Sequence, residues 1–315
     1  MGPCISTLLA NMGAFSGGSS SYHNPATVRR GAVVVANWSN GQPLVAASTT
    51  HKGRVAALNF YPPSSVSRVD FWDRATDGAA LMGNALTWTA RNDNDVLILG
   101  DDFTPGSLND VRRKLRPNVD GTIDTYDYTG PIPSIAALRR YDSIMVYANL
   151  PASDVNVLGD RLADFVDGGG GVVDMFATSS NFWAIGGRWA AAGYSGMIPG
   201  NRDFGTTLTL GAKLYPLHPV LDNVAAVNLG AGSYHNDGAV RPGSLRLADL
   251  SNGRPLAVER STGNGRVVTL NFYPVSADIQ SDLWVVGTDV GRLMANSVNH
   301  VARSDIDALI VGTED

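Results

Sequence analysis

The spacing of apolar and polar residues predicts hairpins at the start of the chain. Three short strand-like runs occupy residues 31–36, 44–47 and 54–60. The pair Asn40-Gly41 between the first two is typical of a two-residue β-hairpin turn. Apolar residues then recur at helical spacing over 78–89, so a helix is expected there.

The period changes in the middle third, where continuously apolar runs alternate with amphipathic stretches. The apolar runs occupy residues 95–100, 143–148 and 172–177, and strands buried on both faces have this character. Helices are expected over 107–115, 134–138 and 154–167, with a glycine run at 168–171 ending the last of them. Strands and helices in short alternation predict a parallel sheet with right-handed crossovers.

After residue 200 the pattern returns to hairpins. Strands are expected at 208–210, 244–247, 256–258 and 266–272, followed by a helix over 283–302. Asn252-Gly253 supplies a second hairpin turn.

The two hairpin regions are copies of one another at a fixed offset. Ser21-Tyr22-His23-Asn24 recurs 212 positions later as Ser233-Tyr234-His235-Asn236, and roughly 31 of 70 positions match without a gap. The run at 95–100 likewise resembles 307–312. We therefore expect three parts: the tail half of a module (1–91), a complete module (92–303) and the first strand of a further repeat (304–315).

Composition narrows the possible functions. The chain is 44% hydrophobic and 17% charged, as expected of a folded protein, and its net charge of -5 argues against nucleic-acid binding. No apolar run is long enough to span a membrane. Cys4 is the only cysteine, which excludes internal disulfides and cysteine-rich zinc sites. Gly2 and Cys4 fit a loose N-terminal acylation pattern, no secretory signal is evident, and the location is left open.

Several motifs resemble the class I glutamine amidotransferase-like superfamily, and most of all its trehalose-utilisation-type branch. They lie at 141–146, 158–173, 186–189, 193–195 and 218–221. The resemblance implies a flavodoxin-like three-layer α/β sandwich for the middle module. Catalytic members carry a cysteine on the turn after the strand at 172–177. Here that turn is Phe-Ala-Thr-Ser-Ser-Asn, so cysteine-dependent chemistry is not expected.

The alternative is a serine-dependent hydrolase or a carbohydrate-active enzyme that uses Ser179. Ser179 would be its nucleophile and His218 its base, with Asp101, Asp102 or Asp174 orienting the base. Against this, serine and threonine in a loop commonly satisfy backbone groups, and a His-Pro pair is also typical of a structural turn.

Ligands of open α/β sheets bind beyond the carboxyl ends of the strands, so a crevice is expected there. Its candidate residues are Asp101, Asp102, Asn149, Thr178 and Trp183. The aspartates suit a metal or a sugar hydroxyl, but also a helix cap, and Trp183 with Trp189 suits sugar stacking or the core. Five histidines are few for a histidine-rich metal site, so neither a metal nor a cofactor is expected.

The missing nucleophile and the duplicated tail together favour a non-catalytic module that acts in binding or self-assembly. The partners considered are further copies, another protein or a glycan. Residues 1–91 lack a parallel core of their own, so their apolar faces must be buried elsewhere. We expect them to pack with the other partial repeat, the strand at 308–312, in the same chain or in a neighbouring one, and exchange between chains would build a filament or an array.

Overall fold

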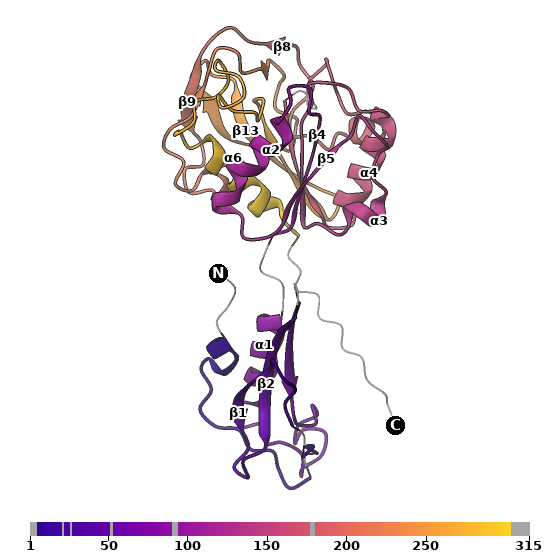
Figure 1. Cartoon of the computed structure of the whole chain (residues 1–315), viewed down its shortest axis with the longest axis vertical. Coiled ribbons are helices and arrows are strands. Elements are labelled where there is room, and N and C mark those ends of the chain that lie inside the picture. Colours follow the sequence, from indigo (N-terminus) through magenta and orange to yellow (C-terminus); the bar gives the residue numbers. More distant parts are fainter. Residues whose placement is uncertain are drawn as a thin grey trace. The chain divides into compact units, whose positions relative to one another are not determined.

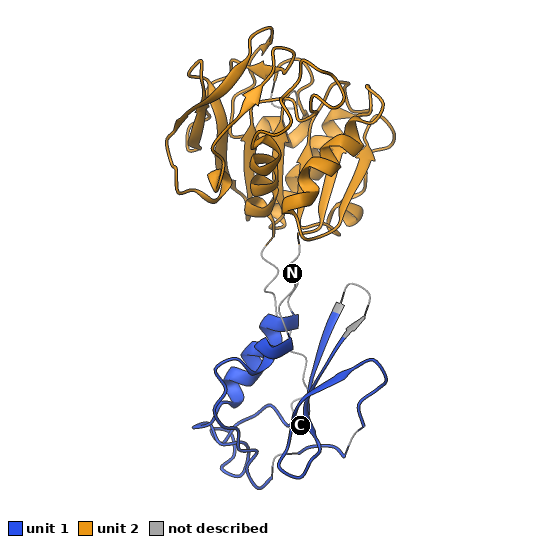
Figure 2. Ribbon diagram, turned by 60° about the vertical axis from the view of Figure 1, so that its left-hand side comes forward, with its two compact units in different colours: residues 1–92, 305–315 blue, residues 93–304 orange. Residues whose placement is uncertain are grey.

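The computed structural model describes residues 5–20, 22–25, 27–50, 53–89, 94–176 and 180–303. The chain forms two compact units that divide between residues 92 and 93 (Figure 2). Below, unit 1 denotes the described residues up to 89 and unit 2 those from 94 to 303. The strand expected at 307–312 lies outside the described residues, as do Gly2, Cys4, Thr178 and Ser179.

Unit 2 is built on a nine-stranded mixed sheet of order β10-β9-β12-β13-β14-β7-β6-β4-β5. Its parallel strands are β4 (Val96–Gly100), β5 (Ile123–Asp127), β6 (Ser143–Val146), β7 (Gly171–Met175) and β14 (Gly265–Leu270). The order β5-β4-β6-β7-β14 is the flavodoxin-like arrangement that the resemblance implied. Strands β4, β6 and β7 are buried at every residue, as their apolar sequences predict.

Helices cover both faces of the parallel strands and complete a three-layer α/β sandwich. They are α2 (Ser107–Leu115), α3 (Ile135–Leu138), α4 (Val155–Asp167), α5 (Gly187–Ala192) and α6 (Val290–Val301), with 3₁₀ turns η2 (Arg116–Asn118) and η3 (Pro219–Leu221). Figure 1 shows α2 and α6 on one side of these strands and α3 and α4 on the other. The α/β fold class expected from the sequence is therefore confirmed.

Helix α4 shows how local sequence sets these elements. The Asp154 carboxylate accepts hydrogen bonds from Asn156 N at 3.0 Å and Val157 N at 2.9 Å, so two free amides of the first turn are satisfied. The helix ends at Asp167 with Gly168 as its C-cap, and Gly169 takes a φ of 88°, which glycine adopts without a Cβ clash.

An antiparallel extension continues the sheet beyond β14. It consists of β9 (Leu208–Lys213), β10 (Asn228–Leu229), β12 (Leu245–Leu250) and β13 (Pro255–Thr262), while β8 (Arg202–Asp203) and β11 (His235–Asn236) form a separate pair.

Two expectations for unit 2 differ from the structure. The last helix starts at Val290 and not at 283, because Gly287 has a φ of 95° and the preceding segment forms turns in which Trp284 bridges to Ser276. The edge strand β5 was not expected, since its sequence Ile-Asp-Thr-Tyr-Asp lacks the continuous apolar run of its neighbours.

Unit 1 is a three-stranded antiparallel sheet of β1 (Val33–Asn37), β2 (Pro43–Thr50) and β3 (Gly53–Leu58). Helix α1 (Gly78–Thr89) and the 3₁₀ turn η1 (Ile5–Leu9) pack on one face. Their contact with the sheet forms a small core that includes Val45, Ala47, Leu81 and Trp88.

Hydrogen bonds of unit 1 recur in unit 2 at the same offset of 212 positions. The Asn59 side chain bonds Asn24 N at 2.8 Å and Pro43 O at 2.8 Å, and Asn271 bonds Asn236 N at 2.8 Å and Pro255 O at 2.9 Å. The Nε1 atoms of Trp72 and Trp284 likewise donate to Pro62 O and Pro274 O, both at 2.7 Å. The two regions therefore share their local structure as well as their sequence.

Candidate functional site

Asp101 lies where β4 ends, but its carboxylate is occupied by backbone groups. One oxygen accepts from Asn149 N at 2.6 Å and Leu150 N at 3.0 Å, and the other accepts from Phe103 N at 3.1 Å. The residue is fully buried. Asp101 thus ties the end of β4 to the segment after β6, and Asn149 contributes its backbone N–H to this link.

Asp102 is exposed and serves the start of α2. Its two oxygens accept from Leu108 N and Gly106 N, both at 3.1 Å. Two amides that a helix start leaves without partners are satisfied in this way. The paired aspartates therefore use their oxygens on the backbone, as the helix-cap alternative supposed.

Trp183 is partly buried against the core of unit 2, and its ring centroid lies 4.4 Å from that of Phe182. The Arg202 guanidinium lies over the Phe182 ring at 4.3 Å and over the Tyr234 ring at 5.2 Å. Phe182 and Arg202 were not among the residues predicted from sequence. Arg202 belongs to β8, about 20 residues after Phe182, and only the fold brings its guanidinium onto the Phe182 ring. Thr178 and Ser179 of the expected crevice lie outside the described residues.

His218 has partners at both ring nitrogens. Its Nε2 lies 2.8 Å from Glu259 Oε2, and its Nδ1 accepts from Val220 N at 3.3 Å at the start of η3. Burial lowers the pKa of His218, which favours the neutral ring. His218 therefore has no free nitrogen to act as the base of a hydrolase in this arrangement.

Glu259 joins His218 to a second histidine, His300. The Nε2 of His300 lies 3.2 Å from Glu259 Oε1, and the two imidazole centroids are 4.7 Å apart. The three side chains are 13–14% exposed, and His300, together with the other histidine, lowers the pKa of Glu259. Sequence analysis missed this cluster, because Glu259 lies about 40 residues from either histidine and no local motif links them.

Unit 1 exposes positions that unit 2 buries. Val55 is 53% exposed, Tyr61 42% and Leu86 50%; their counterparts Val267, Tyr273 and Val298 are 0%, 4% and 0% exposed. In unit 2 these positions face the front half of the module, which we define as β4 to β7 with helices α2 to α5 and the segment 193–197 that follows α5. Strand β14 pairs in parallel with β7, whereas β3 pairs only with β2 among the described residues.

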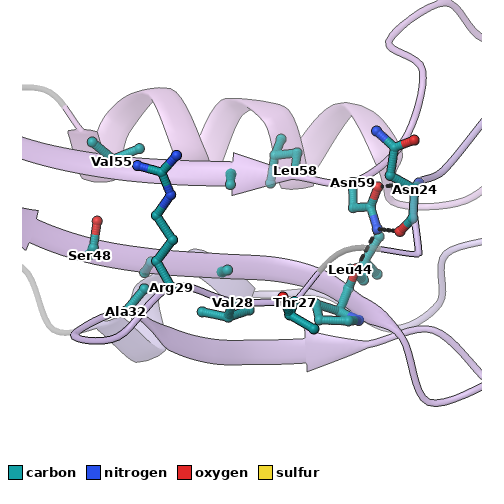
Figure 3. Close-up of a pocket in the computed structure, with 14 residues that line it drawn as sticks. Asn24, Thr27, Val28, Arg29, Ala32, Leu44, Ser48, Val55, Leu58 and Asn59 are labelled. Atoms are coloured by element: carbon teal, nitrogen blue, oxygen red, sulfur yellow. Dashed lines mark hydrogen bonds between the residues drawn. The ribbon is translucent and has the colours of Figure 1, made fainter.

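A cavity of about 340 Å³ lies on this open side of unit 1 (Figure 3). Ala46, Ser48, Val55 and Ala57 line it, and because side chains alternate along a strand, this face is opposite to the one that holds Val45 and Ala47 against α1. The Arg29 side chain extends across it toward Val55.

In unit 2 the equivalent space is filled by the segment 193–197. The Arg241 Nε, counterpart of Arg29, donates to Ser195 O at 3.0 Å. The Gly196 backbone lies against Val258 and Thr269, counterparts of Ala46 and Ala57. The cavity of unit 1 is therefore the place where such a front-half segment would lie. Arg29 is in position there to donate a hydrogen bond to it, as Arg241 does in unit 2. The arginine makes no side-chain hydrogen bond in the described part of unit 1.

Comparisons with known proteins agree with the fold and go no further. No model of a known protein family matches the sequence, and no curated protein does. A solved cytoplasmic protein from Salmonella typhimurium is similar, with a TM-score of 0.51 and 17% identity over 66% of this chain and 99% of that one. At that identity, the likeness shows the fold alone.

Two ThuA-like proteins match with lower scores. The one from Bacteroides uniformis has a TM-score of 0.48 and 17% identity, covering 65% of this chain and 89% of its own. The one from Parabacteroides merdae has a TM-score of 0.48 and 15% identity, covering 70% and 93%. Within the described residues, no helix has the length and apolar character that a membrane crossing requires.

Proposed function

We propose that this chain is a non-catalytic amidotransferase-like protein that self-assembles through unit 1. The observation that carries the proposal is the contrast between Val55 and Val267. The same strand position is half exposed in one unit and covered by a parallel strand in the other. Exposed apolar surface next to an unpaired strand edge favours association.

The proposed occupant of the open face is the front half of unit 2 from a second copy. Unit 1 retains several residues that hold a front half in unit 2: Arg29 for Arg241, Val55 for Val267 and Tyr61 for Tyr273. The second half of unit 2, from β8 to α6, packs on its own front half. Unit 1 of a second copy would compete with it for that front half, so the assembly would form by domain exchange. Each copy offers one open face and one front half, so the contact is heterologous and propagates into rings or filaments.

The only cysteine, Cys4, makes a direct test possible. One chain carries Cys4→Ser with Val55→Cys, and a second carries Cys4→Ser with Val172→Cys. Val172 pairs with Val267 in unit 2, so it is the residue that would face Val55 after exchange. Oxidation of the mixture is expected to give a disulfide-linked heterodimer on a non-reducing gel.

The control mixes the Val55→Cys chain with a chain that carries Cys4→Ser and Val157→Cys. Val157 is 38% exposed on α4 and is not expected to meet Val55. A single 33.2 kDa species by light scattering at every concentration, with no heterodimer above the control, would overturn the proposal. The serine hydrolase alternative gains nothing from the geometry, since both nitrogens of His218 have partners.

A further inference from the structure

His218, Glu259 and His300 form a cluster of potential metal ligands. Among the described residues, it is the one group of three histidine, cysteine or acidic side chains whose ligand atoms lie close enough to share an ion. One atom from each residue lies within 4.8 Å of the other two. Two imidazoles and one carboxylate form a ligand set that zinc uses in proteins. We propose that this cluster is a binding site for a divalent transition metal of the zinc class.

The positions of the ligand atoms suit such an ion. Glu259 Oε2 lies 2.8 Å from His218 Nε2, and Glu259 Oε1 lies 3.2 Å from His300 Nε2. Ligand atoms around tetrahedral zinc, each about 2.0–2.2 Å from the metal, are roughly 3.3 Å apart. The two histidine–carboxylate distances therefore need to lengthen by only a few tenths of an ångström, and all three ligand atoms already lie within 4.8 Å of one another.

His300 is the second histidine of the site. Its Nε2 lies 3.2 Å from Glu259 Oε1, but this contact does not have the geometry of a good hydrogen bond. A bound cation would accept the Nε2 lone pair of the neutral ring directly. His300 also lines a surface hollow with Asp222, Asn296 and Asn299, so water can reach the ion as a further ligand.

Unit 1 shows that the scaffold does not need this cluster to fold. The positions of His218, Glu259 and His300 are held in unit 1 by Ser6, Ala47 and Trp88. Ala47 and Trp88 are 1% exposed and belong to an apolar core. Unit 1 therefore fills two of these three positions with apolar side chains of its core, whereas unit 2 carries metal-binding side chains at all three.

Coordination has two costs. The Val220 N–H bond to Nδ1 puts the proton of neutral His218 on Nε2, so metal binding moves that proton to Nδ1 and breaks the 3.3 Å bond. The Arg266 Nε lies 3.9 Å from Glu259 Oε1, but its side chain is 51% exposed and can turn toward solvent. Both effects lower the affinity for the ion but still allow it to bind.

The test is calorimetric titration of the chelator-treated full chain with Zn²⁺, together with visible spectra after addition of Co²⁺. We expect one ion per chain and the d–d absorption of tetrahedral Co²⁺. His300→Ala should weaken Zn²⁺ binding by at least ~10-fold. Losing a residue that only hydrogen-bonds to a metal ligand already costs about that much, and His300 would be a ligand itself. His23→Ala changes an exposed histidine of unit 1 and should leave binding unchanged.

A second variant guards against misfolding. Glu259→Ala with His300→Trp copies the residues that unit 1 already carries, and should fold but bind no ion at this site. The proposal is overturned if wild-type protein shows neither heat nor Co²⁺ absorption. It is also overturned if binding persists unchanged in His300→Ala and in the double variant, because the ion would then be held by other surface groups.

Discussion

Val55 and Val267 occupy the same place in two copies of one β-strand, yet Val55 is 53% exposed and Val267 is completely buried. Each pairs with the neighbouring hairpin strand in the same register, Val55 with Ser48 and Val267 with Arg260. The difference lies on the other edge, where Val267 also pairs with Val172 of β7. The environment of a residue in this protein therefore depends on whether a front half covers its strand.

The two valines should respond very differently to a charge. Val267→Lys places an ammonium group in the core of unit 2 and should lower the free energy of unfolding by on the order of 4 kcal/mol. Val55→Lys should change the stability of unit 1 by less than about 0.5 kcal/mol, because the side chain reaches water. Calorimetry of both variants measures the stabilities. If Val55→Lys also destabilises unit 1 strongly in dilute solution, where the chain is unassembled, another part of the same chain covers the open face.

Asn59 and Asn271 make matching hydrogen bonds at different depths. Asn271 is fully buried, so Asn271→Ala leaves backbone groups of Asn236 and Pro255 without partners and should cost about 2–4 kcal/mol. Asn59→Ala should cost about 1 kcal/mol or less, because water can replace the lost bonds. Urea unfolding of the paired variants gives the comparison, and equal losses would contradict it.

Asp174 should make the stability of unit 2 dependent on pH. Burial raises the pKa of Asp174 to about 6, although the nearby Ser195 and Thr269 hydroxyls oppose this shift. The unfolded chain loses this proton near pH 3.8, whereas the folded state keeps it until about pH 6. The contribution of Asp174 to the stability is therefore greatest below pH 3.8 and is lost as the pH rises through 6.

The neutral variant Asp174→Asn isolates this effect. At pH 8 it should be more stable than wild type by ~3 kcal/mol, since each pKa unit corresponds to ~1.4 kcal/mol, and at pH 4 the gain should nearly vanish. Thermal unfolding at the two pH values measures the difference. A gain that is the same at pH 4 and pH 8 would show that Asp174 does not titrate in this range.

Two glycines with contrasting surroundings should respond in opposite directions to alanine. A Cβ on Gly171, the first residue of β7, would lie 1.9 Å from Val301 O, so Gly171→Ala must push β7 and the end of α6 apart. We expect a loss of on the order of 3 kcal/mol. Gly83 lies inside α1 with nothing within 4 Å of its Cβ position, so Gly83→Ala should stabilise unit 1 by about 1 kcal/mol. Denaturant unfolding tests both.

The parallel strands and the helices between them could be predicted, because their evidence is local. The apolar run at 95–100 and the Asp154 cap each act over a few residues, and the structure has β4 and α4 there. The strand β5 and the true start of α6 were not predictable in this way. Pairing with β4 and the turns around Trp284 decide them, and both depend on distant residues.

The candidate sites divide along the same line. The sequence identified Asp101 and Asp102 from their place after a strand, but only the structure shows that backbone amides occupy their oxygens. It could not identify the contact between His218, Glu259 and His300, because η3, β13 and α6 meet only in the folded unit.

The sequence by itself determined that the chain contains two related tails, since a repeat of 212 positions is visible without any coordinates. It also determined the α/β character of the middle, because buried parallel strands require continuous apolar runs. Only the tertiary structure decided which tail is covered. Burial is a property of what lies against a strand, so Val55 and Val267 can share a local sequence and still differ completely in their contact with water.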